Sequence, residues 1–224
     1  MEDVIKTRPI VSAELIEKLK EQDVATVHEA MGRRGAMTPD IKPVDPSMKL
    51  CGRALTVSCH SGDNLMLIKA VSMMEPGDVI VADMGHIHDN GPFGEVLAVD
   101  CIAHKAAGIV FNCCVRDSEA LARLAFPTFS SGLCVFGTVK ESKGTINHDV
   151  VVGGIPVHPG DIVLGDRDGV VVIPHEEAEK TLAAANARRE KEARVMERLR
   201  RGESLFEIYG YQRTFDALNI TVEA

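Results

Sequence analysis

GDVIVADMG, residues 77–85, is an apolar run that directly follows a proline and is typical of a strand buried on both faces. Two similar segments flank it: CGRALTVSC at 51–59 alternates in character, and GIVFNCCV at 108–115 is again an apolar run. Helical patterns at about 63–74 and 95–107 separate the three strands. This β-α-β rhythm predicts an α/β domain with a buried sheet.

Helix and strand patterns continue on both sides of this unit. Residues 12–22 and 24–31 have the apolar spacing of two short helices, and after residue 127 strand and turn patterns dominate. Residues 175–201 predict one long charged helix ending at Gly202, most simply a solvated helix braced by i, i+4 ion pairs. The strands expected before it are LCVFGTV (133–139), VVVGGIPV (150–157), GDIVLGD (160–166) and GVVVIP (169–174).

A Pro-Gly-Asp triplet followed by three aliphatic residues occurs twice, at 76–81 and at 159–164. An internal repeat is one interpretation. Because Gly and Asp are common in turns, we interpret both triplets as the same turn chemistry used twice.

Composition limits the classes of function. The chain has 224 residues, 45% of them hydrophobic, which suffices for one domain covering 1–224. Its formal charge of −8 provides no basic surface for nucleic acid. No apolar run approaches the roughly 18 residues of a membrane helix, and the first residues lack the pattern of a secretory signal. We therefore expect a soluble cytoplasmic protein with no nucleic-acid or membrane partner.

The cysteines show no C-x-x-C pair, and most lie in apolar segments. We interpret them as reduced core residues of a cytosolic protein, with zinc binding or nucleophilic catalysis as the alternative. The six are Cys51, Cys59, Cys101, Cys113, Cys114 and Cys134.

Residues 91–108 suggest a binding site at a helix start. Gly94 opens a helical pattern and Glu95 lies in its first turn. Free N–H groups of a first turn, together with the helix dipole, form a seat for a carboxylate, and a glycine there lets a ligand approach the backbone. The alternative is that Glu95 only complements the dipole of its own helix.

The next strand ends in Arg116 and Asp117, at the edge of the sheet where α/β proteins bind ligands. Taken singly, Asp117 could be the N-cap of the following helix and Arg116 a surface ion-pair partner. Two successive strand-to-helix junctions, however, place Glu95, Arg116 and Asp117 at one edge. Carboxylates suit Mg²⁺ or Mn²⁺, while a guanidinium can meet charge on an anionic substrate.

Glu95, twenty intervening residues and then Arg116-Asp117 resemble the signature of the 4-hydroxy-4-methyl-2-oxoglutarate/4-carboxy-4-hydroxy-2-oxoadipate aldolases. These are class II pyruvate aldolases whose superfamily includes the regulator of ribonuclease activity A. The resemblance spans nearly the whole chain in order. Other matching strings are TVHEAMGRRGAM (26–37), GDNLMLIKA (62–70), FGEVLA (93–98), GTVKESKGTIN (137–147), GDRDGVVVIP (165–174) and GESLFEIYG (202–210).

The resemblance implies roles for particular residues. Asp117 would bind Mg²⁺ or Mn²⁺ directly, Glu95 would hold a metal-bound water, and Arg116 would face the keto and leaving-group oxygens. Glu192, or alternatively Glu190, would reach the site from the C-terminal helix of a neighbouring subunit. The family often has Asp where this chain has the longer Glu95. The backbone amides of Gly94, Glu95, Val96 and Leu97 would bind the pyruvyl carboxylate.

The resemblance also implies a fold, an assembly and a reaction. A layered α-β-β-α domain would assemble into homotrimers or homohexamers. It would cleave a 4-hydroxy-2-oxo acid to pyruvate, with oxaloacetate decarboxylation as a side activity, in the breakdown of aromatic compounds. Two other functions stay open: an oxaloacetate decarboxylase whose natural substrate is not an aldol, and a non-catalytic regulator that binds a protein partner.

Three other features receive alternative interpretations. A Schiff-base mechanism needs a desolvated lysine, and the candidates Lys69, Lys105 and Lys140 are more simply surface residues. HIHD at 86–89 has a His-x-His spacing that could bind a transition metal, but it lies in a polar loop. Asn64 is expected at a helix entry, with lining of the site as the alternative.

Overall fold

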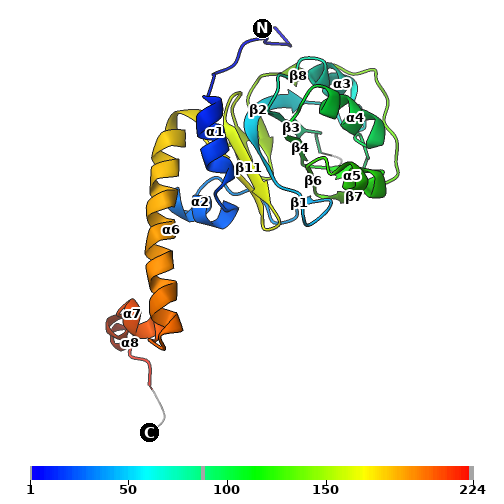
Figure 1. The fold of residues 1–224 in the computed structure, drawn as a ribbon. Coiled ribbons are helices and arrows are strands. Elements are labelled where there is room, and N and C mark those ends of the chain that lie inside the picture. Colours follow the sequence, from blue (N-terminus) through cyan, green and yellow to red (C-terminus); the bar gives the residue numbers. More distant parts are fainter. Residues whose placement is uncertain (1, 87–88, 222–224) are drawn as a thin grey trace.

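The computed structural model describes residues 2–86 and 89–221. A mixed sheet curls until its two edges approach each other, and helices cover its outer sides (Figure 1). Strands β2, β3, β4 and β6 are parallel, whereas β1, β11 and β12 pair antiparallel with their neighbours. The strand order is β1 (Lys42–Pro43), β6 (Thr128–Ser130), β4 (Gly108–Phe111), β3 (Asp78–Asp83), β2 (Leu50–Ser58), β11 (Ile162–Asp166) and β12 (Gly169–Ile173), with β8 (Thr145–Ile146) also on β2.

Two small strand pairs and nine helical segments complete the described chain. The pairs are β9 (Val150–Val152) with β10 (Ile155–Val157), and β5 (Cys114–Val115) with β7 (Gly132–Leu133). The helical segments are α1 (Ala13–Lys20), α2 (Val24–Ala30), α3 (Leu65–Val71), α4 (Glu95–Ala103), α5 (Ser118–Leu124), the 3₁₀ turn η1 (His175–Glu177), α6 (Ala178–Arg200), α7 (Leu205–Ile208) and α8 (Gln212–Ala217).

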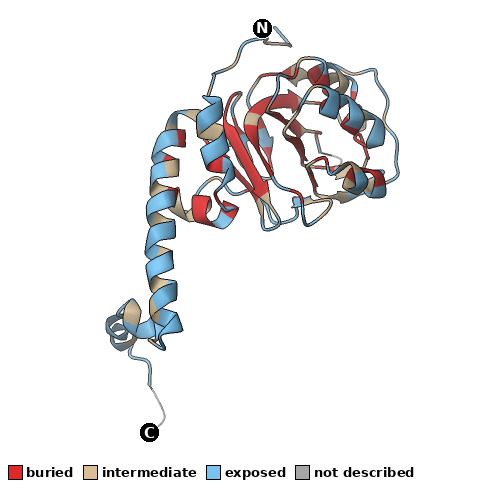
Figure 2. Ribbon diagram, viewed as in Figure 1, coloured by how far each residue is buried: buried red, intermediate tan, exposed pale blue. Residues whose placement is uncertain are grey.

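The apolar core forms three clusters separated by the sheet. Strand β3 shows how: Val79 and Val81 point into the curl of the sheet, whereas Ile80 and Ala82 pack against α3, α4 and α5. On β11, Val163 likewise faces the curl, while Leu164 packs under α1, α2 and α6. The predicted α-β-β-α layering is therefore confirmed, with helix layers outside and sheet layers inside (Figures 1 and 2).

The two Pro-Gly-Asp triplets form turns of the same kind, as predicted. Asp78 accepts a hydrogen bond from Glu75 N at 2.7 Å, and Asp161 accepts one from His158 N at 2.9 Å. The glycines before them have φ of 86° and 89°, which a residue with a side chain rarely adopts. Both carboxylates are buried, with 0% and 2% of the residue exposed.

The prediction of a strand over residues 133–139 is wrong for most of that segment. Only Gly132–Leu133 forms a strand, and Val135 and Phe136 are 84% and 63% exposed. Isolated backbone bonds hold the segment, such as Gly91 N to Phe136 O at 2.9 Å. Apolar composition alone does not distinguish an exposed loop that borders a pocket from a buried strand.

The long C-terminal helix confirms the prediction of a mainly solvated helix. Its buried residues, Ala178, Thr181 and Ala185, all lie in its first third. Beyond them the helix leaves the body and carries α7 and α8, which the sequence did not predict (Figures 1 and 2). In the described residues, 2–86 and 89–221, no helix combines the length and apolar character that crossing a membrane requires.

Candidate functional site

The candidate site lies where β3 and β4 end and α4 and α5 begin. Asp117 occupies the N-cap position of α5 with φ of 56°, a left-handed conformation that Asp tolerates, but its side chain makes no capping bond to α5. Instead, its Oδ2 accepts a hydrogen bond from Glu95 N, the first residue of α4, at 3.1 Å. Asp117 therefore stands at the N-cap position that the alternative interpretation expected, but its carboxylate caps the neighbouring helix α4 and not α5.

Gly94 makes this contact between two loops sterically feasible. A Cβ added at Gly94 would lie closer than 3.0 Å to Asp117 Oδ2. The same loops are joined by Arg116 N, which donates to Phe93 O at 2.9 Å. Gly94 thus serves the close approach of a carboxylate from the same chain, consistent with its position at a helix start.

Arg116 lies beside Asp117, but the two side chains form only a long ion pair. Its Nε is 3.9 Å from Asp117 Oδ2, and both side chains are about half exposed. An exposed pair at this distance contributes little to stability. Its guanidinium therefore remains accessible to an anion entering from solvent.

Glu95 has a partner that the sequence did not reveal. Its Oε1 lies 3.2 Å from Nη2 of Arg123, one helix further along the chain. The two residues are 28 positions apart, and only the packing of α4 against α5 brings them together. Both side chains are exposed, so the contact orients Glu95 toward α5 without burying it.

A surface pocket of about 660 Å³ adjoins Arg116 and Asp117. Its volume falls within the range typical of small-molecule sites. One wall is the loop after β7, where the sequence pattern predicts a strand. The lining residues are Val115, Arg116, Asp117, Ser118, Leu133, Cys134, Val135 and Phe136.

Asn64 supports the loop that leads to Gly94. Its Nδ2 donates to Pro92 O at 2.8 Å, and its buried Oδ1 has no hydrogen-bond partner among the residues that the structure describes. It stands at the helix entry, as predicted, but its side chain does not cap α3. A buried amide oxygen left unpaired is costly, so this atom is suited to a water or ligand donor.

The neighbouring Asp63 holds the loop that contains Glu141 and Ser142. Its Oδ2 accepts from Glu141 N and Ser142 N at 2.6 and 2.7 Å, and its Oδ1 accepts from Leu65 N at 2.8 Å. Burial raises the pKa of this carboxyl, but the three backbone donors outweigh it, so the pKa lies below its usual value.

Glu192 does not belong to the site within one chain. It lies on α6, on the other side of the sheet from α4 and α5, and its Oε1 is 2.8 Å from Arg188 Nε (Figure 1). Glu190 and Glu192 both line a separate depression beside α2. The structure thus brings Glu95, Arg116 and Asp117 together and leaves Glu192 apart, so a role for it requires a second subunit.

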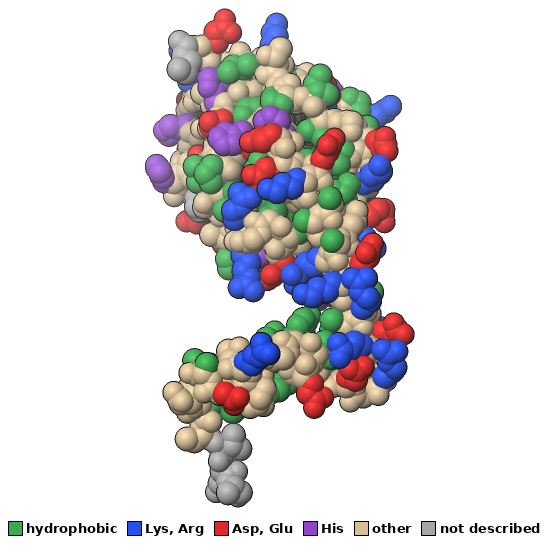
Figure 3. Space-filling model, turned by 90° about the vertical axis from the view of Figure 1, so that its left-hand side faces the viewer, with side chains coloured by type: hydrophobic (Ala, Val, Ile, Leu, Met, Phe, Trp, Pro, Cys, Tyr) green, Lys and Arg blue, Asp and Glu red, His purple; other side chains and the backbone are tan. Residues whose placement is uncertain are grey.

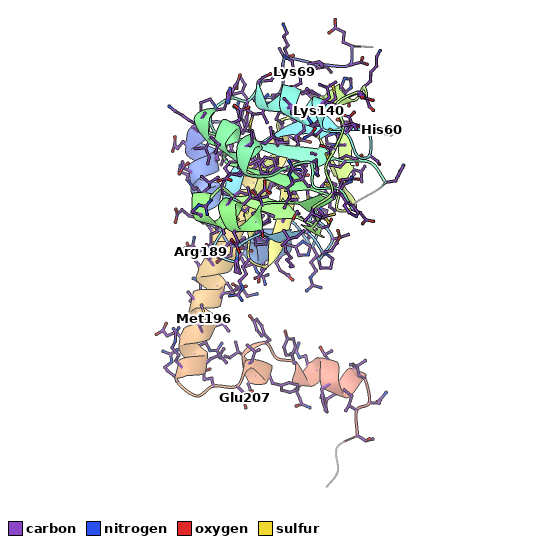
Figure 4. All side chains as sticks on the ribbon, turned by 90° about the vertical axis from the view of Figure 1, so that its right-hand side faces the viewer. His60, Lys69, Lys140, Arg189, Met196 and Glu207 are labelled. Atoms are coloured by element: carbon purple, nitrogen blue, oxygen red, sulfur yellow. The ribbon has the colours of Figure 1, made fainter. Side chains whose placement is uncertain are left out.

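The lysines proposed for a Schiff base are all exposed: Lys69, Lys105 and Lys140. In Figure 4, Lys69 and Lys140 lie at the end of the body remote from Arg189 and Met196 on α6. None is enclosed in the apolar pocket that a Schiff-base mechanism requires.

The cysteines are free thiols, as predicted. Burial raises the pKa of Cys51, Cys59 and Cys101 to about 12, and it also raises the pKa of Cys113. Such thiols stay protonated and are poor nucleophiles. In HIHD, the second histidine, His88, lies outside the described residues.

A group that could hold a metal ion lies elsewhere in the described chain. Asp161, His175 and Glu176 offer ligand atoms within 4.8 Å of one another. His175 and Glu176 lie just before α6 and Asp161 just before β11, whereas Asp117 lies just before α5.

Comparison with known proteins identifies similar chains. A model of the RraA-like family, described as Aldolase/RraA, matches residues 24–172. A protein of Halalkalibacterium halodurans named "Putative 4-hydroxy-4-methyl-2-oxoglutarate aldolase" is 36% identical over 164 residues, 71% of this chain and 76% of that protein. An uncharacterized protein of Methanocaldococcus jannaschii is 32% identical over 170 residues, 75% of this chain and 82% of that protein.

Solved structures share the fold. An uncharacterized protein from Pseudomonas syringae pv. tomato has a TM-score of 0.79 at 24% identity, covering 90% of this chain and 95% of that one. Streptomyces coelicolor RraAS2, titled an unusual member of the RNase ES inhibitor RraA family, has a TM-score of 0.74 at 25% identity, covering 85% of this chain and 98% of that one. The names attached to this fold therefore include both aldolases and an RNase inhibitor family.

Proposed function

The chain belongs to the RraA-like family, described as Aldolase/RraA, and from that premise we propose that it is a metal-dependent pyruvate aldolase. Its substrate would be a 4-hydroxy-2-oxo acid, either 4-hydroxy-4-methyl-2-oxoglutarate or 4-carboxy-4-hydroxy-2-oxoadipate. The aldolase name of the Halalkalibacterium relative supports the reaction class. The observation that carries the proposal is the Asp117 carboxylate beside Arg116 at the first amide of α4.

The donor set fits Mg²⁺ or Mn²⁺. Both ions prefer oxygen ligands and commonly bind through one or two carboxylates, with water and substrate oxygens in the remaining positions. The bond from Glu95 N occupies Asp117 Oδ2 and leaves Oδ1 for an ion. The half-exposed carboxylate borders the pocket, so water and substrate can complete the coordination. When bound, such an ion acts as a Lewis acid that polarises the substrate's keto group.

The chain's own groups would orient the substrate and meet its charge. The N–H groups of a first helical turn, here those of Val96 and Leu97, have no acceptor within the helix and, with the helix dipole behind them, can bind an anionic group. We assign the pyruvyl carboxylate to these amides and to Gly94 N. The amide of Glu95, which the resemblance also implied, already donates to Asp117 Oδ2.

The C4 hydroxyl would give its proton to a base, a C4 carbonyl would form as the C3–C4 bond breaks, and the electron pair of that bond would move toward the C2 oxygen as an enolate. Arg116 meets the negative charge there. Return of a proton to C3 would then give pyruvate.

Glu95 and Glu192 are assigned to the water and proton steps. Glu95, held by Arg123, would position a water molecule at the rim of the site. Glu192 would enter from the α6 helix of a neighbouring copy, since its own site lies on the other side of the sheet. We therefore propose a homotrimer or homohexamer. Glu190 is the alternative to Glu192, and the exposed far half of α6 is compatible with either.

Two alternative functions have specific consequences. Decarboxylation of oxaloacetate also places negative charge on the C2 oxygen of a pyruvyl group, so the same residues would serve it, as a side or main activity. A regulator resembling the RNase inhibitor family would need no metal and no Arg116. The clustering of Glu95, Arg116 and Asp117 favours an enzyme over this regulator.

An assay with three substrates distinguishes these functions. Purified protein with Mg²⁺ is incubated with each aldol acid and with oxaloacetate, and pyruvate is followed over time. We expect two pyruvates per 4-hydroxy-4-methyl-2-oxoglutarate, because cleavage of C3–C4 gives two identical fragments. Turnover of oxaloacetate alone would make the protein a decarboxylase. No pyruvate from any substrate with Mg²⁺ or Mn²⁺ would contradict an enzymatic function.

A further inference from the structure

Asp161, His175 and Glu176 place one imidazole and two carboxylates together, away from α4 and α5. Asp161 ends the turn between β10 and β11, and His175 and Glu176 form the 3₁₀ turn before α6. Figure 3, which faces the α6 side of the molecule, shows histidine and acidic side chains gathered on the upper part of this face. The proposed aldolase function uses none of them.

The distances fit a shared ion better than paired hydrogen bonds. His175 Nδ1 is 3.3 Å from Asp161 Oδ1 and 3.2 Å from Glu176 Oε2. One ring nitrogen carries at most one hydrogen, and charge-assisted bonds are usually about 2.7–2.9 Å long. Ligands about 2.0–2.1 Å from a tetrahedral ion lie about 3.3–3.4 Å from each other. Both separations from His175 are close to that edge length, and the two carboxylate oxygens lie within 4.8 Å of each other.

The charge balance of Asp161 differs from that of its counterpart Asp78. Asp78 ends the same Pro-Gly-Asp turn and is equally buried, but Arg8 and Arg53 form ion pairs with it. Among the ion pairs of residues 2–86 and 89–221, Asp161 has only His175, and Glu176 likewise has only His175. The further imidazole nearby, His158, is ion-paired to Asp149, whose hydrogen bond raises its pKa, and Asp161 and Glu176 contribute to that rise. Asp78 has two guanidinium groups, whereas no Lys or Arg among the described ion pairs balances Asp161 and Glu176.

Backbone contacts hold the cluster in place before any ion binds. Asp161 Oδ2 accepts from His158 N at 2.9 Å, its Oδ1 accepts from His175 N at 3.1 Å, and its carbonyl accepts from Ala54 N at 2.7 Å. The Glu176 side chain is 69% exposed, which leaves one side open for an ion and water to enter. A fixed, buried ligand facing an open side is the arrangement that metal sites require.

We propose that Asp161, His175 and Glu176 bind a divalent transition-metal ion, with Zn²⁺ the best match, at a site separate from Asp117. Imidazole combined with carboxylates selects Zn²⁺ over Mg²⁺, which prefers oxygen ligands alone. Water completes the fourth position. The ion fastens the start of α6 to the β10–β11 turn, so its main effect is on the anchoring of that helix. The inference is independent of the proposed aldolase activity.

Calorimetric titration of chelator-treated protein with ZnCl₂ tests the site. The Asp117→Asn variant is used as the parent, which removes the other candidate metal ligand. We expect one Zn²⁺ per chain. His175→Gln and Glu176→Gln in this parent should each weaken binding by at least about tenfold, since even outer contacts of a metal site cost that much. Glu179→Gln, the same change on an exposed residue one turn away, should leave binding unchanged.

Thermal unfolding provides a second measurement that does not depend on activity. Because an ion that binds only the folded state stabilises it, Zn²⁺ should raise the Tm of the parent and of Glu179→Gln but not of Glu176→Gln. Circular dichroism verifies that each variant is folded, and the exposed Glu176 side chain makes that variant safe to interpret. A folded parent that binds no Zn²⁺, or His175→Gln and Glu176→Gln variants that bind as tightly as the parent, would overturn the proposal.

Discussion

At the scale of single residues, the position of Asp117 depends on the absence of a side chain at Gly94. The carboxylate comes close enough to accept from Glu95 N because nothing projects from Gly94 into the gap. A left-handed backbone at Asp117, which Asp tolerates, turns the side chain away from its own helix. Both details concern how two loops meet, so neither follows from local sequence patterns.

Substituting Gly94 by Ala should therefore impair activity without unfolding the protein. The new methyl group would displace Asp117 and lower kcat/KM by at least about tenfold, since small misplacements of catalytic groups are costly. Gly137→Ala is the matched control, because the nearest atom to its added Cβ is Arg116 Nη1 at 3.9 Å. Steady-state pyruvate formation measures both. Equal activity of the two variants would contradict the assigned role of Gly94.

Arg116→Lys tests whether the guanidinium acts on charge that develops during the reaction. A lysine keeps the positive charge but loses the planar fork of donors. We expect kcat to fall by about 10²–10³-fold, the usual cost of removing such a contact, with a smaller change in KM. Arg123→Lys, a matched change on a more exposed residue, should have a much weaker effect. An unchanged kcat in Arg116→Lys would remove Arg116 from the mechanism.

At the scale of elements, loops between strands and helices form the site and its supports. Asp63, at the entry to α3, holds the loop containing Glu141 and Ser142, and Asn64 beside it holds Pro92. The sequence predicted the strand-to-helix junctions because apolar runs and glycines mark them clearly. It did not predict that residues 134–139 form an exposed loop, because that outcome depends on which strand edges are available.

Asp63→Asn should destabilise the protein by about 1–3 kcal/mol near neutral pH, because backbone donors lose a charged acceptor. The pKa of Asp63 is lowered in the folded state, so its contribution is present above its unfolded pKa and is lost as pH falls through the folded value. The advantage of the wild type over Asp63→Asn should therefore shrink below about pH 4. Urea unfolding at several pH values measures this. An advantage that grows as pH falls would contradict the assignment.

At the scale of the whole molecule, α6 extends from the body with its far half exposed (Figure 2). Its length was predictable from composition, since Ala, Glu, Lys and Arg favour helices. The direction of α6 and the presence of α7 and α8 were not predictable, because local sequence patterns do not determine how a helix leaves the body of the protein. Two successive strand-to-helix junctions predicted the grouping of Glu95, Arg116 and Asp117, and the family resemblance implied their roles. Their contacts with Arg123 and Gly94 emerged only from the fold.

Mixing two inactive variants tests whether subunits share a site. Asp117→Asn and Glu192→Gln proteins, each with little activity alone, should regain activity when refolded together, because some mixed sites combine an intact Asp117 with a neighbour's Glu192. Glu190→Gln in place of Glu192→Gln is the control and should remain active by itself. Failure of the mixed oligomers to regain activity would contradict a shared site. If Glu190→Gln is inactive alone and is rescued by Asp117→Asn, while Glu192→Gln stays active, Glu190 is the contributing residue.

The central claim is that Asp117 holds a divalent ion needed for cleavage. The most direct test is pyruvate formation from 4-hydroxy-4-methyl-2-oxoglutarate as a function of Mg²⁺, by wild type and Asp117→Asn, with Asp100→Asn on the exposed face of α4 as control. We predict that wild type and Asp100→Asn respond to Mg²⁺ and lose activity with a chelator. Asp117→Asn should be at least about 100-fold less active at every Mg²⁺ concentration. Undiminished, Mg²⁺-independent pyruvate formation by Asp117→Asn would contradict the account.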